Sequence, residues 1–336
     1  MNAAEHNPGE RQDAVRVRGS ARLHMGFLDL NGGLGRRFGS IGMALDAPAT
    51  ELLIAHAPRD VIDGPEAERV GRHLATLTLA LGLRGGHRIT VRQAIPAHSG
   101  LGSGTQLALA LATALRRLHG LPPDRAGDAA RLGRGARSGI GVALFAAGGF
   151  VLDGGRGAAD RPPPLLARLP VPADWRVLLV LDRAQQGLSG AGEAAAFRAL
   201  PPMPEATAAR LCRLALVRLL PALAEADLVD FGAALAQIQV IVGDYFAPAQ
   251  GSRFASPRVA AALAALTAAG AHGAGQSSWG PTGFAFAPDE ATARSWREAV
   301  RPHGEGLDIR ICRALNHGAA VSRVAAASVR PRRAAA

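Results

Sequence analysis

The sequence predicts two packed domains of mixed α and β structure, either α+β or α/β, and three observations support this fold class. The chain has 336 residues, of which 48% are hydrophobic, more apolar material than one small core accommodates. Helix-like and strand-like segments alternate along it, as in mixed folds. A proline-rich stretch at residues 161–172 separates two such series and indicates a boundary between them.

Each half shows its own periodicity. In the first half, residues 15–18 and 87–91 alternate polar and apolar side chains as half-buried strands do, and residues 106–118 have the apolar repeat of a packed helix. The second half predicts, in order, a strand at 176–181, helices at 207–219, 227–245 and 257–269, a strand at 283–287, a helix from 289 and a strand at 308–313. The predicted domains are therefore residues 14–165 and 172–324, with frayed tails at 1–13 and 325–336.

The net charge of +11 comes from arginine alone, because the sequence contains no lysine. Schiff-base chemistry and a Walker-type phosphate lysine are therefore excluded. The arginines are spread along the chain and aromatic residues make up only 4%, whereas nucleic-acid binding favours basic clusters interleaved with stacking aromatics. A basic nucleic-acid-binding protein is thus a remote alternative, and we expect small molecules as the partners.

No uninterrupted apolar run approaches the 18 or so residues of a membrane span, and the first 20 residues, with Glu5, Glu10 and Asp13, lack the apolar centre of a secretion signal. We therefore expect no membrane partner and a cytoplasmic location. Cys212 and Cys312 lie in apolar surroundings and are expected to be reduced, buried thiols.

A glycine-rich turn leads directly into the predicted helix at 106–118. The free N–H groups and positive end of a helix start bind anions, glycines let the backbone approach a phosphate, and hydroxyls add donors. A merely tight strand-to-helix turn would not need so many glycines and hydroxyls. We therefore predict a phosphate site at Ser99, Gly100, Gly102, Ser103, Gly104 and Thr105.

These residues resemble the GHMP superfamily of small-molecule kinases. Pro96-x-x-x-Gly100-Leu101-Gly102-Ser103 is similar to its second motif, whose loop holds nucleotide phosphates. Arg22-Leu23-His24 with Asp29 occupies the place of the first motif, and Gly273-Ala274-Gly275 that of the third. The resemblance implies the two-domain GHMP fold, with a ribosomal-protein-like N-terminal domain and a ferredoxin-like C-terminal domain.

The kinase chemistry itself is poorly matched. Gly141 stands where such kinases carry an aspartate base, Gly104 replaces a serine of their loop, and no lysine is present. Phosphoryl transfer depends on positioning and charge neutralisation, so these losses together weigh against a kinase. An ATP-dependent GHMP kinase remains the alternative, because some members work without the aspartate.

The departures match a more specific family within the superfamily. Five blocks resemble the β-ribofuranosylaminobenzene 5′-phosphate synthases, namely residues 22–30, 100–106, 133–141, 148–155 and 275–282. The resemblance implies a decarboxylating pentosyltransferase that condenses phosphoribosyl pyrophosphate with 4-aminobenzoate and releases CO2 and pyrophosphate in tetrahydromethanopterin biosynthesis. The sequence leaves open whether 4-hydroxybenzoate is the acceptor instead, and whether the chain is a monomer or a homodimer.

The same resemblance suggests roles for individual residues. We expect Asp29 and Asp153 to bind Mg2+ and, with His24, to act in catalysis, and we expect no organic cofactor. A carboxylate would stabilise the oxocarbenium-like sugar as the diphosphate leaves. The remaining substrate-binding candidates are Arg22, Arg134, Arg137, Gln276, Ser277 and Trp279.

Arg134 or Arg137 is expected to orient the acceptor carboxylate, and Phe150 or Trp279 to pack on its ring. Three of the candidate residues also have simpler structural explanations. His24 is equally explained as a core histidine, Asp153 as a residue that shapes a turn, and Trp279 as ordinary packing.

Overall fold

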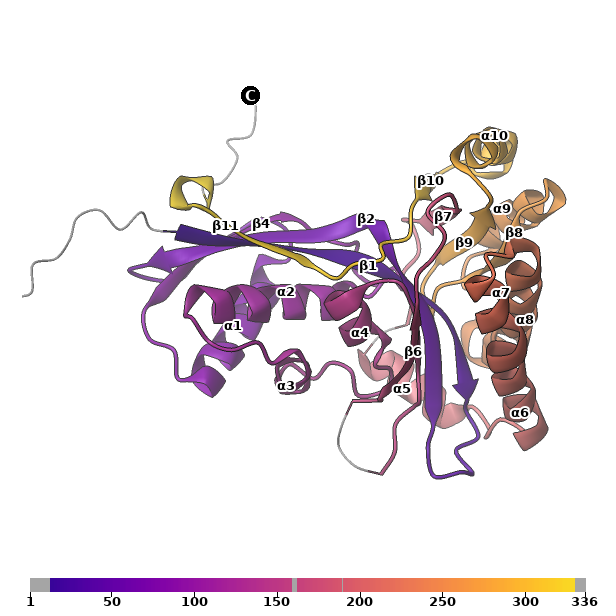
Figure 1. Ribbon diagram of the computed structural model, residues 1–336, viewed down its shortest axis with the longest axis horizontal. Helices are drawn as coiled ribbons and strands as arrows, with labels where there is room; N and C mark the ends of the chain where they lie inside the picture. The colour runs from indigo at the N-terminus through magenta and orange to yellow at the C-terminus, as the bar shows by residue number, and fades with distance from the viewer. Residues whose placement is uncertain (1–12, 159–161, 189, 330–336) are drawn as a thin grey trace, which may run out of the picture.

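The computed structural model describes residues 13–158, 162–188 and 190–329. Its first domain is built on a seven-stranded sheet with the order β11-β1-β2-β4-β3, in which β5 pairs with β2 and β6 with β5. The strands are β1 (Asp13–Asp29), β2 (Phe38–Ala57), β3 (Val61–Asp63), β4 (Gly86–Gln93), β5 (Phe150–Asp153), β6 (Leu165–Leu169) and β11 (Ala320–Ala325). Four helices cover one face of this sheet, α1 (Ala67–Leu81), α2 (Ser103–Leu118), α3 (Arg125–Arg131) and α4 (Ile140–Ala147) (Figure 1).

The second domain contains a four-stranded antiparallel sheet of order β10-β7-β9-β8. Its strands are β7 (Arg176–Asp182), β8 (His272–Gln276), β9 (Thr282–Ala287) and β10 (Leu307–Cys312). Leu178 and Val180 face one core with α9 (Pro257–Ala268) and α10 (Glu290–Val300), whereas Leu179 and Leu181 face another. Because β7 is buried on both faces, it is a continuous apolar run in the sequence.

A shared core joins the two domains. Met25 of β1, Leu179 of β7 and Ile238 of α8 (Leu228–Gln250) belong to one buried cluster. The helical layer on this side also contains α5 (Gly190–Ala199), α6 (Glu205–Leu214), the π-helical segment η1 (Ala215–Leu219) and α7 (Leu220–Ala224). Figure 1 shows the long β1–β2 pair running from the first domain to this helical layer.

Local sequence explains where the later helices begin. Asp227, Ser256 and Asp289 each accept a hydrogen bond from a backbone N–H in the first turn of α8, α9 and α10, respectively. Such N-caps satisfy amide groups that have no partner within the helix. All the helices and strands expected from periodicity are present. Most agree with their predicted bounds within a few residues, but the strand predicted at 15–18 is part of β1, which continues to Asp29.

The predicted domain limits were less accurate. β11 returns from the second domain to pair antiparallel with β1, so residues 320–325 belong to the first sheet. The expected tail from 325 is structured as far as Val329, which is buried with Ala14 and Leu53. The proline-rich boundary stretch contains β6, which pairs with β5. Of the expected tail at residues 1–13, Asp13 begins β1 and residues 1–12 lie outside the described residues, as does the end of the chain from 330.

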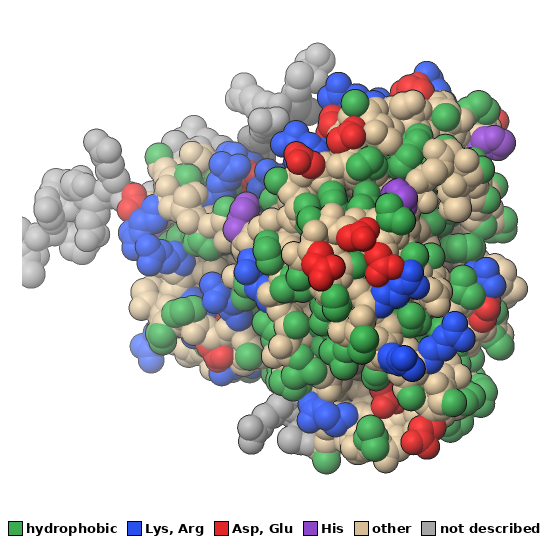
Figure 2. Space-filling view, turned by 45° about the vertical axis from the view of Figure 1, so that its right-hand side comes forward, with side chains coloured by type: hydrophobic (Ala, Val, Ile, Leu, Met, Phe, Trp, Pro, Cys, Tyr) green, Lys and Arg blue, Asp and Glu red, His purple; other side chains and the backbone are tan. Residues whose placement is uncertain are grey.

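Within the described part of the chain, no helix is both long and apolar enough to cross a membrane. On the face shown in Figure 2, arginine side chains are scattered among acidic and hydrophobic ones and do not form one continuous patch.

Candidate functional site

The predicted phosphate turn lies between β4 and α2, where the backbone conformation requires glycine. Gly100 has a φ of 82° and Gly102 a φ of 77°, in the left-handed region that residues with a Cβ avoid. Gly102 is the N-cap residue of α2, which begins at Ser103 and runs for 16 residues into the core. A helix of this length presents free N–H groups and the positive end of its dipole at the turn, as an anion site needs.

Arg22 of β1 lies directly against this turn. Its Nη1 donates to the carbonyl oxygen of Gly100 at 2.7 Å, and a Cβ added to Gly102 would lie only 2.7 Å from the Arg22 Cγ. Burial lowers the pKa of Arg22 to about 10, because desolvation disfavours its charged form. A buried cation beside a helix N-terminus favours an anionic ligand.

Arg134 approaches the other side of the turn. A Cβ at Gly104 would lie 3.0 Å from the Arg134 Nη1, so the glycine makes room for the guanidinium. Among the described residues, the buried Nε of Arg134 has no hydrogen-bond partner, and burial lowers the pKa of the group. Two of the arginines predicted from sequence therefore flank the turn.

Arg137 follows in the same glycine-rich segment and forms an ion pair with a residue that the sequence did not indicate. Its Nη2 donates to the Oε2 of Glu193 on α5 at 2.6 Å. Desolvation raises the pKa of Glu193, while the positive charges of Arg137 and Arg22 act to lower it. Glu193 stands in an Ala- and Gly-rich segment without a motif, so only its three-dimensional position identifies it.

Ser277 and Gln276 hold this part of the site together. The hydroxyl of Ser277 donates to the Gly100 carbonyl oxygen at 2.8 Å and accepts from the His24 backbone N–H at 3.1 Å. The Gln276 amide bonds to the side chain of Gln250 and to the backbone of Ala255. Ser277, just after β8, therefore supports the turn, whereas Gln276 at the end of β8 bonds to α8 and to the segment that follows it. Contact of either residue with substrate stays a prediction.

His24 is almost fully buried. Desolvation and the nearby Arg22 hold its pKa well below the usual range, so the ring is neutral at physiological pH. Its buried Nε2 has no hydrogen-bond partner in the part of the chain that the structure describes, and the ring borders a small cavity of about 20 Å3 with Gln239 and Gln276. The ring also contacts Phe27 at 4.3 Å between centroids. These contacts fit a core histidine, and a catalytic role stays a prediction.

Asp153 has a structural environment that its predicted catalytic role did not anticipate. It is 1% exposed, and its two oxygens accept four hydrogen bonds, from the N–H groups of Ser40, Gly139 and Gly155 and from the Ser138 hydroxyl. Burial nevertheless raises its pKa. Because these bonds occupy the lone pairs that a magnesium ion would need, the geometry favours the turn-shaping alternative.

Asp29 shapes a turn as well. Its Oδ1 accepts from the backbone N–H groups of Asn31 and Gly32 at the end of β1. Asp29 and Asp153 line one cavity of about 230 Å3, together with Arg37 and Cys212. No group of three or more potential metal ligands comes together among the described residues. The predicted Asp29–Asp153 magnesium pair does not fit this arrangement, and no chemical step below depends on it.

Both aromatic candidates for ring packing lie in the core. Phe150 is fully buried against Phe231, and Trp279 is 2% exposed and stacked on Phe246 at 4.0 Å. In this structure neither ring is open to a ligand, which corrects the expectation that they contact the acceptor.

The hydroxyls of the turn differ in their surroundings. Ser99 donates to the Pro96 carbonyl oxygen and so stabilises the turn itself. Ser103 and Thr105 lie half-buried in the first turn of α2. A Cβ at Gly141 would lie 3.1 Å from the Thr105 Cγ2. Position 141, where kinases carry a base, is therefore packed tightly against the first turn of α2.

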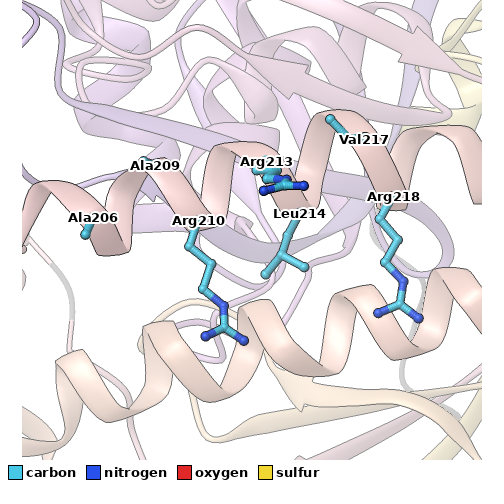
Figure 3. Close-up of a pocket in the computed structure, with 7 residues that line it drawn as sticks. All are labelled: Ala206, Ala209, Arg210, Arg213, Leu214, Val217 and Arg218. Carbon is cyan, nitrogen blue, oxygen red and sulfur yellow. The ribbon is translucent and has the colours of Figure 1, made fainter.

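A larger surface hollow of about 620 Å3 lies elsewhere, along α6 and η1. Figure 3 shows Arg210 and Arg218 reaching from this helix toward the neighbouring one, where they meet Gln237 and Asp230 of α8. Arg210 and Arg218 bond to α8, and none of the predicted site residues lines this hollow, so it is not the candidate site.

Family comparisons agree with this architecture. Residues 68–149 match the GHMP kinases N-terminal domain and residues 219–306 the GHMP kinases C-terminal domain. Homoserine kinase from Cytophaga hutchinsonii superposes with a TM-score of 0.66 at 18% identity, over 95% of this chain and 100% of that one. Mevalonate diphosphate decarboxylase from Staphylococcus aureus gives a TM-score of 0.66 at 14% identity, over 92% and 98%. The chain therefore has the two-domain GHMP fold.

Relatives by sequence are more specific. The β-ribofuranosylphenol 5′-phosphate synthase of Archaeoglobus fulgidus is 37% identical over 67% of this chain and 75% of its own length. The synthase of the same name from Methanothermobacter thermautotrophicus is 32% identical over 80% and 88%. The chain thus belongs to this synthase family within the GHMP superfamily, a family of enzymes that transfer a ribosyl group.

Proposed function

We propose that the chain condenses phosphoribosyl pyrophosphate with 4-aminobenzoate to form β-ribofuranosylaminobenzene 5′-phosphate, CO2 and pyrophosphate. The observation that carries this proposal is the glycine turn at the start of α2, flanked by the partly buried guanidinium groups of Arg22 and Arg134. Such a site suits a donor with two separated anionic groups. Gly141, at the place of the kinase base, supports transfer of the sugar over transfer of phosphate.

In the proposed reaction, the bond between C1 of the ribose and the diphosphate oxygen breaks, and the diphosphate leaves with the electron pair. The helix N–H groups and Arg22 stabilise the negative charge of the bound phosphates. The ring carbon that carries the carboxylate attacks C1 from the opposite side, which converts an α donor into a β product. Loss of CO2 then returns the electrons of the carboxylate bond to the ring and restores aromaticity.

A single para substituent distinguishes the two candidate acceptors. Two relatives are named for a phenol product, which 4-hydroxybenzoate would give. We therefore keep 4-hydroxybenzoate as the second candidate acceptor. Arg137 is our candidate to orient the acceptor carboxylate, because its side chain is partly exposed and its partner Glu193 also interacts electrostatically with Arg22 beside the turn. Arginine binds carboxylates through two parallel hydrogen bonds.

The wider biological setting is part of the proposal. The reaction would serve tetrahydromethanopterin biosynthesis in the cytoplasm, with magnesium carried by the donor diphosphate. The fold neighbours include kinases, but at 21% identity and below this likeness concerns the fold alone. The glycine turn would also hold nucleotide phosphates, and the observation that weighs against an ATP-dependent kinase is Gly141 at the place of the base.

A substrate panel tests this proposal. Purified protein is incubated with phosphoribosyl pyrophosphate and magnesium chloride, together with 4-aminobenzoate, 4-hydroxybenzoate or benzoate, and pyrophosphate release is measured. We expect release that depends on a para-amino or para-hydroxy acceptor. Consumption of ATP with a small alcohol, and no acceptor-dependent pyrophosphate, would contradict the proposal.

A further inference from the structure

α5 begins beside the phosphate turn. The backbone N–H of Gly187, just before this helix, donates to the carbonyl oxygen of His98 at 3.0 Å. A Cβ at Gly187 would lie 2.3 Å from the Trp279 carbonyl oxygen, so this segment also packs closely against the backbone of Trp279. The first turn of α5 is therefore held near the start of α2, although about 90 residues separate the two helices in sequence.

Glu193 occupies this first turn of α5 and is fixed in place. Its Oε2 accepts from Arg137 at 2.6 Å, and the guanidinium carbon of Arg137 lies 5.8 Å from the ring centre of Phe197, one helical turn further along α5. The Glu193 side chain is 17% exposed. Within the described part of the chain, its other oxygen, Oε1, has no hydrogen-bond partner.

The charge of Glu193 also acts on Arg22, which lies against the phosphate turn. Its negative charge acts to raise the pKa of Arg22, the residue that bonds to the Gly100 carbonyl oxygen. Glu193 is thus a carboxylate set among the arginines of the phosphate site. Asp153, the carboxylate that the sequence suggested for this role, has its oxygens occupied by four hydrogen bonds.

A sugar joining two anions would lie between the groups that hold them. In the proposed complex, one anion of the donor binds at the helix start and the other at Arg22 and Arg134, while Arg137 serves the acceptor. The ribose between the two anions would then pass close to Glu193. A fixed carboxylate with a free oxygen stabilises positive charge as it develops on such a sugar. It needs no covalent bond to the sugar, because the acceptor carbon forms the new bond to C1.

We propose that Glu193 is the carboxylate that faces the ribosyl group of the donor and stabilises its positive charge as pyrophosphate leaves. This inference rests on the proposed function, since it requires a phosphoribosyl donor. It places the sugar-facing carboxylate on α5 of the second domain, whereas Asp153 keeps only its structural role in a turn of the first domain.

The test compares Glu193→Gln with Arg137→Gln in the full chain, with Glu298→Gln on the exposed end of α10 as a matched control. Donor affinity is measured by calorimetry with phosphoribosyl pyrophosphate, and turnover by pyrophosphate release with 4-aminobenzoate. Glutamine keeps the size of the side chain and removes its charge. We expect Glu193→Gln to lower kcat about 100- to 1,000-fold, as loss of a transition-state interaction does, while donor Kd changes less than threefold.

The two variants separate a direct role from a supporting one. If Glu193 only anchors Arg137, then Glu193→Gln and Arg137→Gln will lower kcat equally and their double variant will lose no more, which would overturn the inference. We expect instead that Arg137→Gln mainly raises the acceptor KM and that Glu298→Gln behaves as the wild type. Should Glu193→Gln fail to fold, Glu193→Asp provides the test, because it keeps the charge but withdraws it from the sugar, and unchanged kcat would overturn the inference.

Failure of the proposed function gives a different result. A wild-type protein that releases no pyrophosphate with any acceptor would remove the basis of both proposals. A wild-type protein that is active, with a Glu193→Gln variant of normal kcat, would overturn the Glu193 role alone.

Discussion

Replacing Gly102 with alanine tests the phosphate turn most sharply. Gly102 has a φ of 77°, and its new Cβ would lie 2.7 Å from the Arg22 Cγ. The left-handed conformation costs a residue with a Cβ roughly 1–2 kcal/mol. The clash adds a second effect, because Arg22 must move away from the turn.

The effect on binding follows from the displaced arginine. A hydrogen bond that involves a charged group contributes about 1.5–3 kcal/mol, and each 1.4 kcal/mol is about tenfold in Kd. If Arg22 loses one such contact with a bound phosphate, the donor Kd rises about 10- to 100-fold. Calorimetric titration with phosphoribosyl pyrophosphate measures this change, alongside the free energy of unfolding in urea.

Gly120 provides a matched control, since it has a φ of 67° and no atom within 4 Å of an added Cβ. It lies at the far end of α2. Gly120→Ala should therefore show the conformational cost without the loss of donor affinity. A folded Gly102→Ala protein with wild-type donor affinity, or an equal affinity loss in Gly120→Ala, would refute the reasoning.

Two further predictions concern stability. Asp153→Asn should lower the free energy of unfolding by about 1–3 kcal/mol, because an amide group turned toward the Gly139 N–H leaves that buried donor unsatisfied; an unchanged urea midpoint would refute the structural role. We expect the free energy of unfolding to fall as the pH is lowered, because burial and the neighbouring Arg134 lower the pKa of His73 in the folded protein from 6.5 to about 4. Below pH 6.5 the unfolded chain then binds more protons, so stability is present above that pH and declines toward pH 4. Urea midpoints should fall less over this range in His73→Gln, and equal slopes for both proteins would contradict the assignment.

The phosphate turn was predictable because its signals are local. Gly100 and Gly102 stand beside hydroxyl residues at the start of a strongly periodic helix, and both adopt the left-handed backbone that only glycine favours. Long apolar elements such as α8 and β7 were predictable for the same reason, since their periodicity or continuous burial is visible within a short window.

The rest depends on partners that are distant in sequence. Asp153 satisfies the backbone of Ser40, 113 residues earlier, so its burial leaves no mark on the local sequence. The side chain of Glu193 is held in the site by an ion pair with Arg137, 56 residues away. β11 is a short strand that returns to β1 across the whole chain, and six residues of mostly small side chains carry a weak strand signal.

Release of labelled CO2 tests the central claim most directly. The purified protein is incubated with phosphoribosyl pyrophosphate and 4-aminobenzoate that carries the label in its carboxyl group, with carboxyl-labelled 4-hydroxybenzoate in parallel. The account predicts labelled CO2 in equal amount to pyrophosphate, with one of the two acceptors and only when the donor is present. Retention of the label in both acceptors, with transfer of phosphate from ATP to a small alcohol instead, would contradict it.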